Sequence, residues 1–213
     1  MRVALPKGHL QADALEFLKR AGIEFTFRND RDYRPSCNRS DVFGKLVKVK
    51  AIPQLIHLGQ YHVGFCGLDL VEENDYDLVE PILDLGLNPV QIVVALPHGT
   101  EGILSHPPKR PLLIATEYVH LAERWAFARN LAHIAVQTYG STEAYPPEDA
   151  DLIFDNTETG RTIEANGLVI VDTVLTSTTH LVANKLALSD PGVAPRIEEL
   201  KRILMDAKEM GND

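Results

Sequence analysis

The sequence predicts an α/β protein built from two lobes, and three observations support this prediction. Short apolar runs rich in β-branched residues alternate with segments whose apolar residues recur at helical spacing. The chain has 213 residues, enough for one large domain or two small ones. The turn signal Asn88-Pro89 precedes the strongest strand pattern, QIVVALP. We expect residues 1–88 plus 180–213 to form domain I and residues 89–179 to form domain II.

Domain I is expected to open with a strand in RVALP, followed by a helix. Apolar residues between Leu10 and Ala21 fall on one helical face, and Gly22 is placed to end the helix. KLVKVK and HVGFCG predict two further strands, and Pro53 opens a short helix, PQLIHLG, between them. Residues 195–210 show helical spacing and predict a closing amphipathic helix.

Domain II is expected to contain strands in QIVVALP, PLLIAT, AHIAVQTYG and ADLIFDN, with one helix through YVHLAERWAFARN. On that helix Leu121, Trp125 and Ala128 form a stripe that is expected to belong to the core. The β-branched segment GLVIVDTVLTSTTHLVANK predicts either one long strand or a pair of strands.

The composition narrows the class of protein. With 45% hydrophobic and 24% charged residues, the chain is typical of globular proteins, and no apolar run approaches the ~20 residues of a membrane helix. The start, MRVALPKGHL, shows no signal-peptide pattern, so we expect a cytoplasmic protein. A net charge of −9 argues against binding nucleic acid, although not against binding a small anion. Cys37 and Cys66 make no disulfide framework.

The segment DLIFDNTETGRT, residues 151–162, runs from a predicted buried strand into a hydroxyl-rich loop that contains glycine. Such a loop can direct several backbone N–H groups at one phosphate, and threonine hydroxyls can donate to the same oxygens. Asp155, at the end of the strand, can accept hydrogen bonds from sugar hydroxyls. We expect this loop to be exposed. A turn stabilised by Thr and Asp side chains explains the pattern equally well, so the residues alone leave both interpretations open.

DNTETGRT, preceded by GSTEAYPPEDADLIF and followed by IEANGL, resembles the phosphoribosyl-pyrophosphate motif of the ATP phosphoribosyltransferase family. Four more segments resemble this family, so that the resemblance covers nearly the whole chain: ALPKG, IPQLIHLGQYHVGFCGLDLVEE, QIVVALP and LIATEY. The length resembles the short form of the family, which lacks a C-terminal regulatory domain. The resemblance implies the two-lobed α/β fold of type II periplasmic binding proteins, with the substrates in a central cleft.

The implied activity is the first step of histidine biosynthesis. N1 of ATP attacks C1 of phosphoribosyl pyrophosphate, pyrophosphate leaves, and phosphoribosyl-ATP forms. The implied cofactor is Mg²⁺, held mainly through the substrates rather than by a metal site of the protein. The resemblance also implies a homodimer and a regulatory subunit that resembles histidyl-tRNA synthetase. Neither nucleic acid nor a membrane is expected as a partner.

The resemblance assigns roles to single residues. The 5-phosphate of the substrate is assigned to Thr159, Gly160, Arg161 and Thr162. Asp155 would hold the ribose hydroxyls with help from Glu158, and Glu143, in GSTE, is assigned to the ribose or the charged reaction centre. Lys7 would meet a phosphate, and Asp69 would be an acid of the cleft.

Three of these residues have ordinary alternatives. Glu143 also fits a carboxylate at the start of a helix, where the helix dipole favours negative charge. Lys7 also fits a charge that faces solvent, and Asp69 also fits a helix N-cap.

The chain departs from the family pattern at three positions. His9 stands where the family usually has Arg, and a histidine is charged only below its pKa of about 6.5, so phosphate binding there is expected to be weaker or pH-dependent. Ala51 and His62 stand where the family usually has Asp. The spacing of His57, His62 and Cys66 does not place three zinc ligands on one side, so no metal site is expected there.

Two other classes of function remain open at this point. One is a two-lobed protein that binds a ligand without chemistry, including an inactive paralogue. The other is a phosphoribosyltransferase that uses a different acceptor base.

Overall fold

The computed structural model describes residues 1–210, which divide into two compact units. Unit 1 comprises Met1–Asn88 and Thr178–Asp213, and unit 2 comprises Pro89–Ser177. The sequence placed the same first boundary after residue 88 and the second after residue 179. That the two segments act as separate domains stays a prediction.

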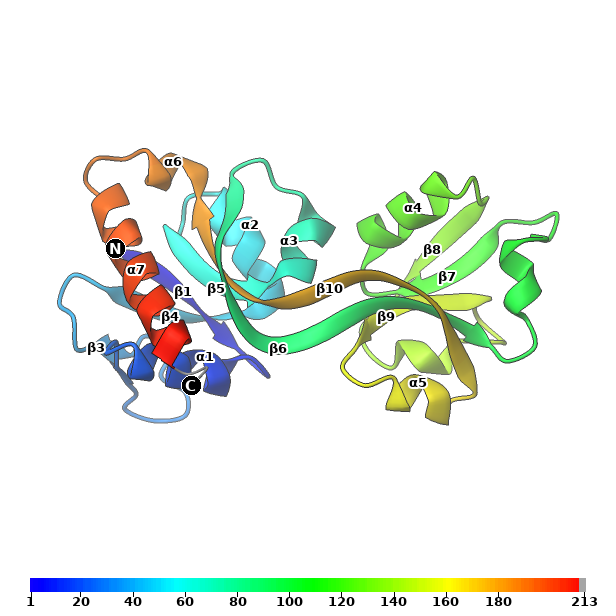
Figure 1. Ribbon diagram of the computed structural model, residues 1–213, viewed down its shortest axis with the longest axis horizontal. Coiled ribbons are helices and arrows are strands. Elements are labelled where there is room, and N and C mark those ends of the chain that lie inside the picture. The colour runs from blue at the N-terminus through cyan, green and yellow to red at the C-terminus, as the bar shows by residue number, and fades with distance from the viewer. Residues whose placement is uncertain (211–213) are drawn as a thin grey trace. The chain divides into compact units, whose positions relative to one another are not determined.

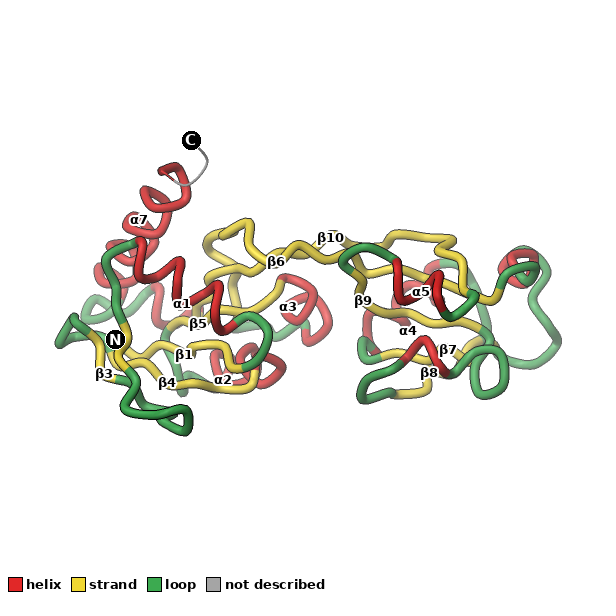
Figure 2. The backbone as a smooth tube through the Cα atoms, turned by 90° about the horizontal axis from the view of Figure 1, so that it is seen from below, coloured by secondary structure: helices red, strands yellow, loops and turns green. Residues whose placement is uncertain are grey.

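Two long strands run from one unit into the other. They are β6 (Val79–Pro97) and β10 (Leu168–Asn184), and they are neighbours in the sheet (Figure 1; Figure 2). The segment for which the sequence left open one strand or two is therefore the single strand β10.

Unit 1 is built on three parallel strands and one antiparallel strand, in the order β4-β1-β5-β10. Helices α1 and α7 pack against each other (Figure 2). In chain order, the remaining elements of this unit are β1 (Arg2–Lys7), α1 (Gln11–Arg20), β2 (Phe25–Thr26), β3 (Ser36–Cys37), β4 (Phe43–Lys48), the 3₁₀ helix η1 (Val49–Ala51), α2 (Ile52–His57), β5 (Val63–Gly67), α3 (Leu68–Asn74), α6 (Lys185–Leu188) and α7 (Ala194–Met210).

The alternation of side chains along β1 assigns one helix layer to each face of this sheet. Val3 and Leu5 belong to the buried core that also contains residues of α1 and α7. Ala4 points to the opposite face, toward α2. On that face Gly64 of β5 allows close packing, because a Cβ atom there would lie 2.8 Å from Cγ2 of Ile52.

Unit 2 is built on the second part of β6 and three further strands, in the order β6-β9-β7-β8. Strand β9 is antiparallel to β6 and parallel to β7, and β7 is parallel to β8. In chain order, the elements confined to this unit are η2 (Glu101–Leu104), β7 (Leu112–Thr116), α4 (Val119–Ala128), β8 (His133–Gln137), η3 (Thr142–Ala144), β9 (Leu152–Thr157) and α5 (Arg161–Ala165).

Strand β9 separates the two helices of unit 2. Phe154 contacts Trp125 of α4, with the ring centroids 6.2 Å apart. Ile153 belongs to a different buried cluster, which includes Ile163 of α5. Because side chains alternate along a strand, Asp155 points to the same face as Ile153, the face next to α5. The strand therefore directs the Asp155 carboxylate, two residues before its end at Thr157, to the side of the loop that precedes α5.

Two local predictions are wrong. The Asn88-Pro89 pair does not form a turn, because β6 continues through it. Asn88 adopts a left-handed conformation with φ of 50°, which asparagine tolerates better than most residues, and its side chain accepts a hydrogen bond of 3.1 Å from the Thr179 hydroxyl. Ala128 is exposed at the end of α4 instead of belonging to the core.

The other helices and strands named above agree with the sequence pattern, and Trp125 and Leu121 are buried as expected. Within residues 1–210, no helix combines the length and the apolar character needed to cross a membrane.

Candidate functional site

A pocket of about 340 Å³ lies in unit 2 at the carboxyl end of β9. We call it the β9 pocket. Its lining residues are Glu143, Ile153, Asp155, Asn156, Thr157, Glu158, Thr159, Thr162 and Ile163. Five of the residues singled out in the sequence therefore lie around one cavity: Glu143, Asp155, Glu158, Thr159 and Thr162.

The loop after β9 is held by one side chain of its own. The backbone N–H of Gly160 donates a hydrogen bond of 2.8 Å to Oγ1 of Thr157. Gly160 has φ of 75° and is buried, whereas Glu158 and Thr159 are exposed. The expectation that the whole loop is exposed is thus wrong for Gly160, which the loop turns inward. The left-handed conformation explains why a glycine stands at this position.

The loop presents free donors. The backbone N–H groups of Arg161, Thr162 and Ile163 have no acceptor within residues 1–210, since the first bond of α5 runs from the N–H of Glu164 to the carbonyl of Gly160. The side chains of Thr159 and Thr162 line the pocket beside these amides. Backbone amides and threonine hydroxyls together make a site for an anion that does not depend on basic side chains.

Asp155 occupies the most perturbed environment of the pocket. Burial raises the pKa of its carboxyl group, and the negative charges of Glu117 and Glu143 raise the pKa further. Hydrogen bonds from the Thr142 side chain and from the Asn156 backbone N–H, 2.8 Å from Oδ1, oppose this shift. A carboxylate that is half-buried and close to other acids binds hydrogen-bond donors or positive charge strongly, because these relieve its unfavourable environment.

The charged side chains that line the β9 pocket are all acidic. Three carboxylates line it, and no Lys or Arg does so in the described chain. Arg161 is exposed on the adjoining loop and does not line the cavity. An anion must therefore bind at the amides and hydroxyls, and the carboxylates are left for groups that donate hydrogen bonds or carry positive charge.

Several supporting residues escaped the sequence analysis. Nδ2 of Asn156 donates a hydrogen bond of 2.6 Å to the hydroxyl of Tyr118, and the buried hydroxyls of Thr138 and Thr142 lie 2.8 Å apart. Asn156 and Thr157 are part of the quoted motif, and Thr142 precedes Glu143 in GSTE, so their place in the motifs was the available signal.

Glu143 lies in η3 and is half-buried. This 3₁₀ helix has only three residues, and Glu143 is the acidic residue of its first turn. The alternative of a carboxylate at a helix start is therefore compatible with its position in the pocket, and the two descriptions do not exclude each other.

Lys7 and Asp69 belong to unit 1, at the carboxyl ends of the parallel strands β1 and β5. Nζ of Lys7 donates a hydrogen bond of 2.9 Å to the hydroxyl of Tyr33 and lies 4.4 Å from the centroid of its ring. Asp69 is 7% exposed in the first turn of α3. The alternative of an N-cap is wrong for Asp69, because Gly67 occupies the N-cap position.

His62 has a structural role in unit 1. Its Nδ1 accepts a hydrogen bond of 3.1 Å from the backbone N–H of Arg2, and burial lowers the pKa of its imidazole. The ring of His57 stacks on Tyr76 at 4.9 Å. Cys66 is buried, and burial raises the pKa of its thiol. In the described part of the chain, no three His, Cys, Asp or Glu side chains are arranged to hold a metal ion.

Comparisons with known proteins show the family and the fold of this chain. The family model "HisG: ATP phosphoribosyltransferase" matches residues 48–206. The ATP phosphoribosyltransferase of Chlorobium phaeobacteroides is 36% identical over 213 residues, which are 97% of this chain and 71% of that protein. A chain from the ATP phosphoribosyl transferase (HisG:HisZ) complex of Thermotoga maritima has a TM-score of 0.85 and 26% identity, with 99% of both chains covered.

A fold shared with binding proteins is also found. An arginine-binding protein from Thermotoga maritima has a TM-score of 0.56 and 13% identity, over 100% of this chain and 90% of that one. The molecule thus has the α/β fold of type II periplasmic binding proteins, as expected. The central cleft of that expectation concerns the placement of the two units and stays a prediction.

The family match and the similar relatives place this α/β protein among the transferases of the phosphoribosyltransferase type. The chain belongs to the ATP phosphoribosyltransferase family, which carries out the first step of histidine biosynthesis. The resemblance seen in the sequence and the assignment as an enzyme are therefore confirmed. The roles of single residues are not tested by these comparisons.

Proposed function

We propose that this chain binds phosphoribosyl pyrophosphate in the β9 pocket and transfers its phosphoribosyl group to N1 of ATP. The products are phosphoribosyl-ATP and pyrophosphate. The observation that carries the proposal is the composition of the pocket, in which free amides and hydroxyls adjoin two partly buried carboxylates. A phosphorylated ribose needs both kinds of group in one pocket, one for its phosphate and one for its hydroxyls.

The 5-phosphate is assigned to the loop. The amides of Arg161 and Thr162 and the hydroxyls of Thr159 and Thr162 supply donors, and the left-handed turn at Gly160 lets the backbone approach the phosphate. Arg161 adds a positive charge beside the site. The charge of the phosphate itself is then stabilised by fixed dipoles, which cost little reorganisation during the reaction.

The ribose is assigned to Asp155, with Glu158 assisting at the rim. The ribose hydroxyls donate hydrogen bonds to the Asp155 carboxylate, and this favours its ionised form against the burial that raises its pKa. As the bond from C1 to pyrophosphate breaks, positive charge builds on the sugar ring. Asp155 and Glu143 stabilise that charge, so both contribute more in the transition state than in the ground state.

Mg²⁺ is the proposed cofactor. We assign this ion mainly to the phosphates of the substrates, since Mg²⁺ is usually bound through substrate phosphates and one or two carboxylates. When bound, this ion neutralises the charge of the leaving pyrophosphate. We further propose that Lys7 meets a phosphate and that Asp69 contacts the second substrate.

We also propose a homodimer that works with a regulatory partner in the cytoplasm. The regulatory partner is supported by the similarity to a chain of the HisG:HisZ complex of Thermotoga maritima.

The proposal is tested by incubating the chain with ATP, phosphoribosyl pyrophosphate, Mg²⁺ and a pyrophosphatase, and by detecting phosphoribosyl-ATP by mass spectrometry. We expect product from the wild-type chain, and about 10²–10³-fold less from Asp155→Asn, as for the loss of one group that stabilises transition-state charge. Asp149→Asn is the matched control, because Asp149 is exposed just before β9 and does not line the pocket. Binding of phosphoribosyl pyrophosphate without product, with or without added partner, would contradict the assigned transfer to ATP.

A further inference from the structure

A second cavity, of about 520 Å³, lies in unit 1 and has no part in the proposed transfer. We call it the amino-end pocket, because it lies where β1 and β4 begin and just before β5. Its lining residues are Arg2, Arg34, Pro35, Ser36, Cys37, Arg39, Ser40, Val42, Phe43, Gly44, Lys45, Gln60 and Tyr61. A volume of this size accommodates a small organic ligand.

The amino-end pocket is positive in an otherwise acidic chain. Four of its lining residues are basic and none is acidic, although the chain carries 30 Asp and Glu against 21 Lys and Arg. The side chains of Arg34 and Lys45 have no hydrogen-bond or ion-pair partner among residues 1–210. The guanidinium of Arg2 donates to the carbonyl of Gly59 at 2.7 Å and to no carboxylate in that part of the chain. The positive charges of Arg2, Arg34 and Lys45 are therefore available to bind one anion.

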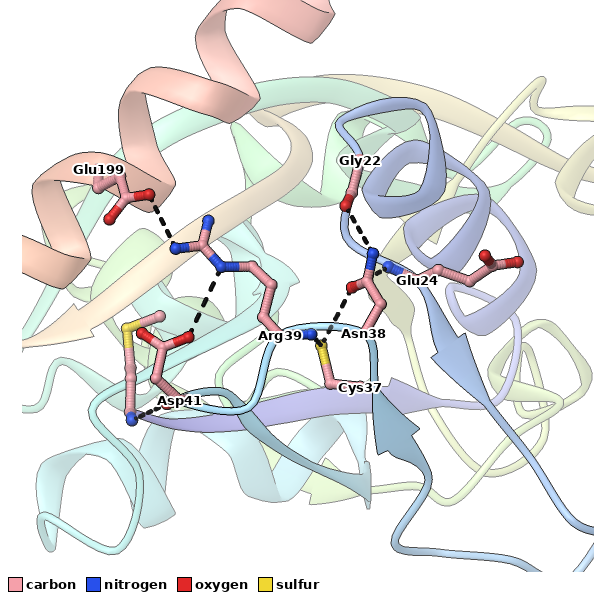
Figure 3. A network of polar contacts seen from close by, with 8 residues as sticks. Gly22, Glu24, Cys37, Asn38, Arg39, Asp41 and Glu199 are labelled. Atoms are coloured by element: carbon pink, nitrogen blue, oxygen red, sulfur yellow. Dashed lines mark hydrogen bonds and ion pairs between the residues drawn. The ribbon is translucent and has the colours of Figure 1, made fainter.

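Arg39 is different, because its charge is already balanced. Its guanidinium lies 2.8 Å from Oε1 of Glu199 and 3.6 Å from Oδ1 of Asp41. The neighbouring Asn38 donates to the carbonyl of Gly22 and accepts from the N–H of Glu24, both at 3.0 Å (Figure 3). These contacts tie the 37–41 loop to α7 and to the segment that follows α1, so one wall of the pocket is fixed before any ligand binds.

The opposite wall offers an aromatic surface. Phe43 is paired with Arg2, and Lys45 with Ala4, in the parallel register of β4 and β1, so these side chains share one face of the sheet. Phe43 is 64% exposed there, which is unusual for a large apolar side chain. Tyr61 adds a second ring to the lining. A planar ring can stack on this wall while an anionic group reaches the three cations.

The amino-end pocket is separate from the residues assigned to the transfer. Lys7 and Asp69 stand at the carboxyl ends of β1 and β5, whereas Arg2 stands at the amino end of β1. Five residue steps along an extended strand separate Arg2 from Lys7 by about 16 Å. The β9 pocket belongs to the other unit.

From this combination we infer that the amino-end pocket binds a small aromatic phosphate of the size of a nucleoside monophosphate. The phosphate interacts with Arg2, Arg34 and Lys45, and the ring stacks against Phe43. The inference goes beyond the proposed transfer and does not depend on it.

The test uses Phe43→Trp, which places a fluorophore in the pocket. The wild-type chain is the control, because its single tryptophan, Trp125, is buried in unit 2. With GMP, and with AMP as a second probe, we expect a saturable fluorescence change only in the variant. An added Arg34→Glu should weaken binding about tenfold or more, as the loss of a charge-assisted contact does. An added Arg31→Glu should leave binding unchanged. This substitution makes the same change of charge as Arg34→Glu in the same loop, but Arg31 does not line the pocket.

A second measurement needs no substitution. Cys37 lines the amino-end pocket and is half-exposed, whereas Cys66 is buried. GMP should slow the alkylation of Cys37 by iodoacetamide, and inorganic phosphate or guanosine alone should do so at least about tenfold less effectively. The inference is overturned if neither nucleotide protects Cys37 or changes the fluorescence. It is also overturned if inorganic phosphate matches GMP, or if Arg31→Glu weakens binding as much as Arg34→Glu.

Discussion

Two glycines flank helix α5. Variants at these two positions distinguish an effect on phosphate binding from an effect on the stability of the fold. Gly160 precedes the helix with φ of 75°, and Gly167 follows it with φ of 73°. A Cβ atom at Gly160 would lie 3.4 Å from Cδ1 of Ile170, an ordinary contact, and one at Gly167 would meet no atom within 4 Å. Replacement by alanine therefore costs each position mainly the left-handed backbone conformation.

That cost is about 1–2 kcal/mol for an L-residue with a Cβ atom. In a chain of this size, each kcal/mol lowers the melting temperature by roughly 2–4 °C. We thus expect Gly160→Ala and Gly167→Ala to lose about 2–8 °C each, and to lose similar amounts. Gly160 itself is buried, which differs from the exposed loop that the sequence predicted.

The two variants should differ in ligand binding. Relief of strain at Gly160 moves its N–H away from Oγ1 of Thr157 and displaces the amides that face the pocket. Calorimetric titration with phosphoribosyl pyrophosphate and Mg²⁺ should show at least about tenfold weaker binding by Gly160→Ala, which corresponds to about 1.4 kcal/mol. Gly167→Ala should bind as the wild type does. Equal affinities in the two variants would refute the assignment of the phosphate to this loop.

Three further predictions follow from ionisation and burial. Asp155→Asn should raise the melting temperature at pH 7, because burial raises the pKa of Asp155 and its ionised form destabilises the fold. The gain should disappear as the pH falls through this raised pKa, since the carboxyl group is then protonated in the wild type as well. A lower melting temperature of the variant at pH 7 would argue against this account. Arg110→Ala should lower the denaturant midpoint of unfolding at pH 7, since Arg110 donates to both carboxylate oxygens of Asp151 at 2.7 Å. The arginine lowers the pKa of Asp151, so this difference should shrink as the pH falls through that lowered pKa, whereas a constant difference would indicate lost packing. Iodoacetamide should label Cys37 but not Cys66 in the native chain, and both after unfolding; mass spectrometry showing labelled native Cys66 would contradict its burial.

The sequence predicted the elements well where one physical pattern dominated. Periodicity located the strands and the helices, including α7, because burial of an apolar face determines both kinds of element. The prediction of a turn at Asn88 was wrong, because this turn signal lies inside the long strand β6. Local turn propensity there is outweighed by pairing with neighbouring strands, and asparagine tolerates the left-handed conformation that results.

The candidate site was predicted in part, because some of its residues are neighbours in the sequence. The motif places Asp155 and the threonine-rich loop next to each other in sequence, and the alternation along β9 turns Asp155 toward that loop. Most of the contacts that change the pKa of Asp155 come from elsewhere in the chain, so the sequence next to Asp155 gives no signal for them. Thr142 and Glu117 reach Asp155 only because the strands and loops of unit 2 converge there, and Tyr118 reaches Asn156 in the same way.

The most direct test of the central assignment is to map where phosphoribosyl pyrophosphate binds. Backbone amide shifts of the ¹⁵N-labelled chain would be followed by NMR while the ligand and Mg²⁺ are added. The largest shifts are expected at the amides of residues 159–163, with smaller shifts at Asp155 and Glu143. Within residues 1–210 the amides of Arg161, Thr162 and Ile163 have no acceptor, and that of Gly160 bonds Oγ1 of Thr157 in the same loop. Saturable binding that leaves residues 159–163 unshifted would contradict the assignment of this loop to the phosphate.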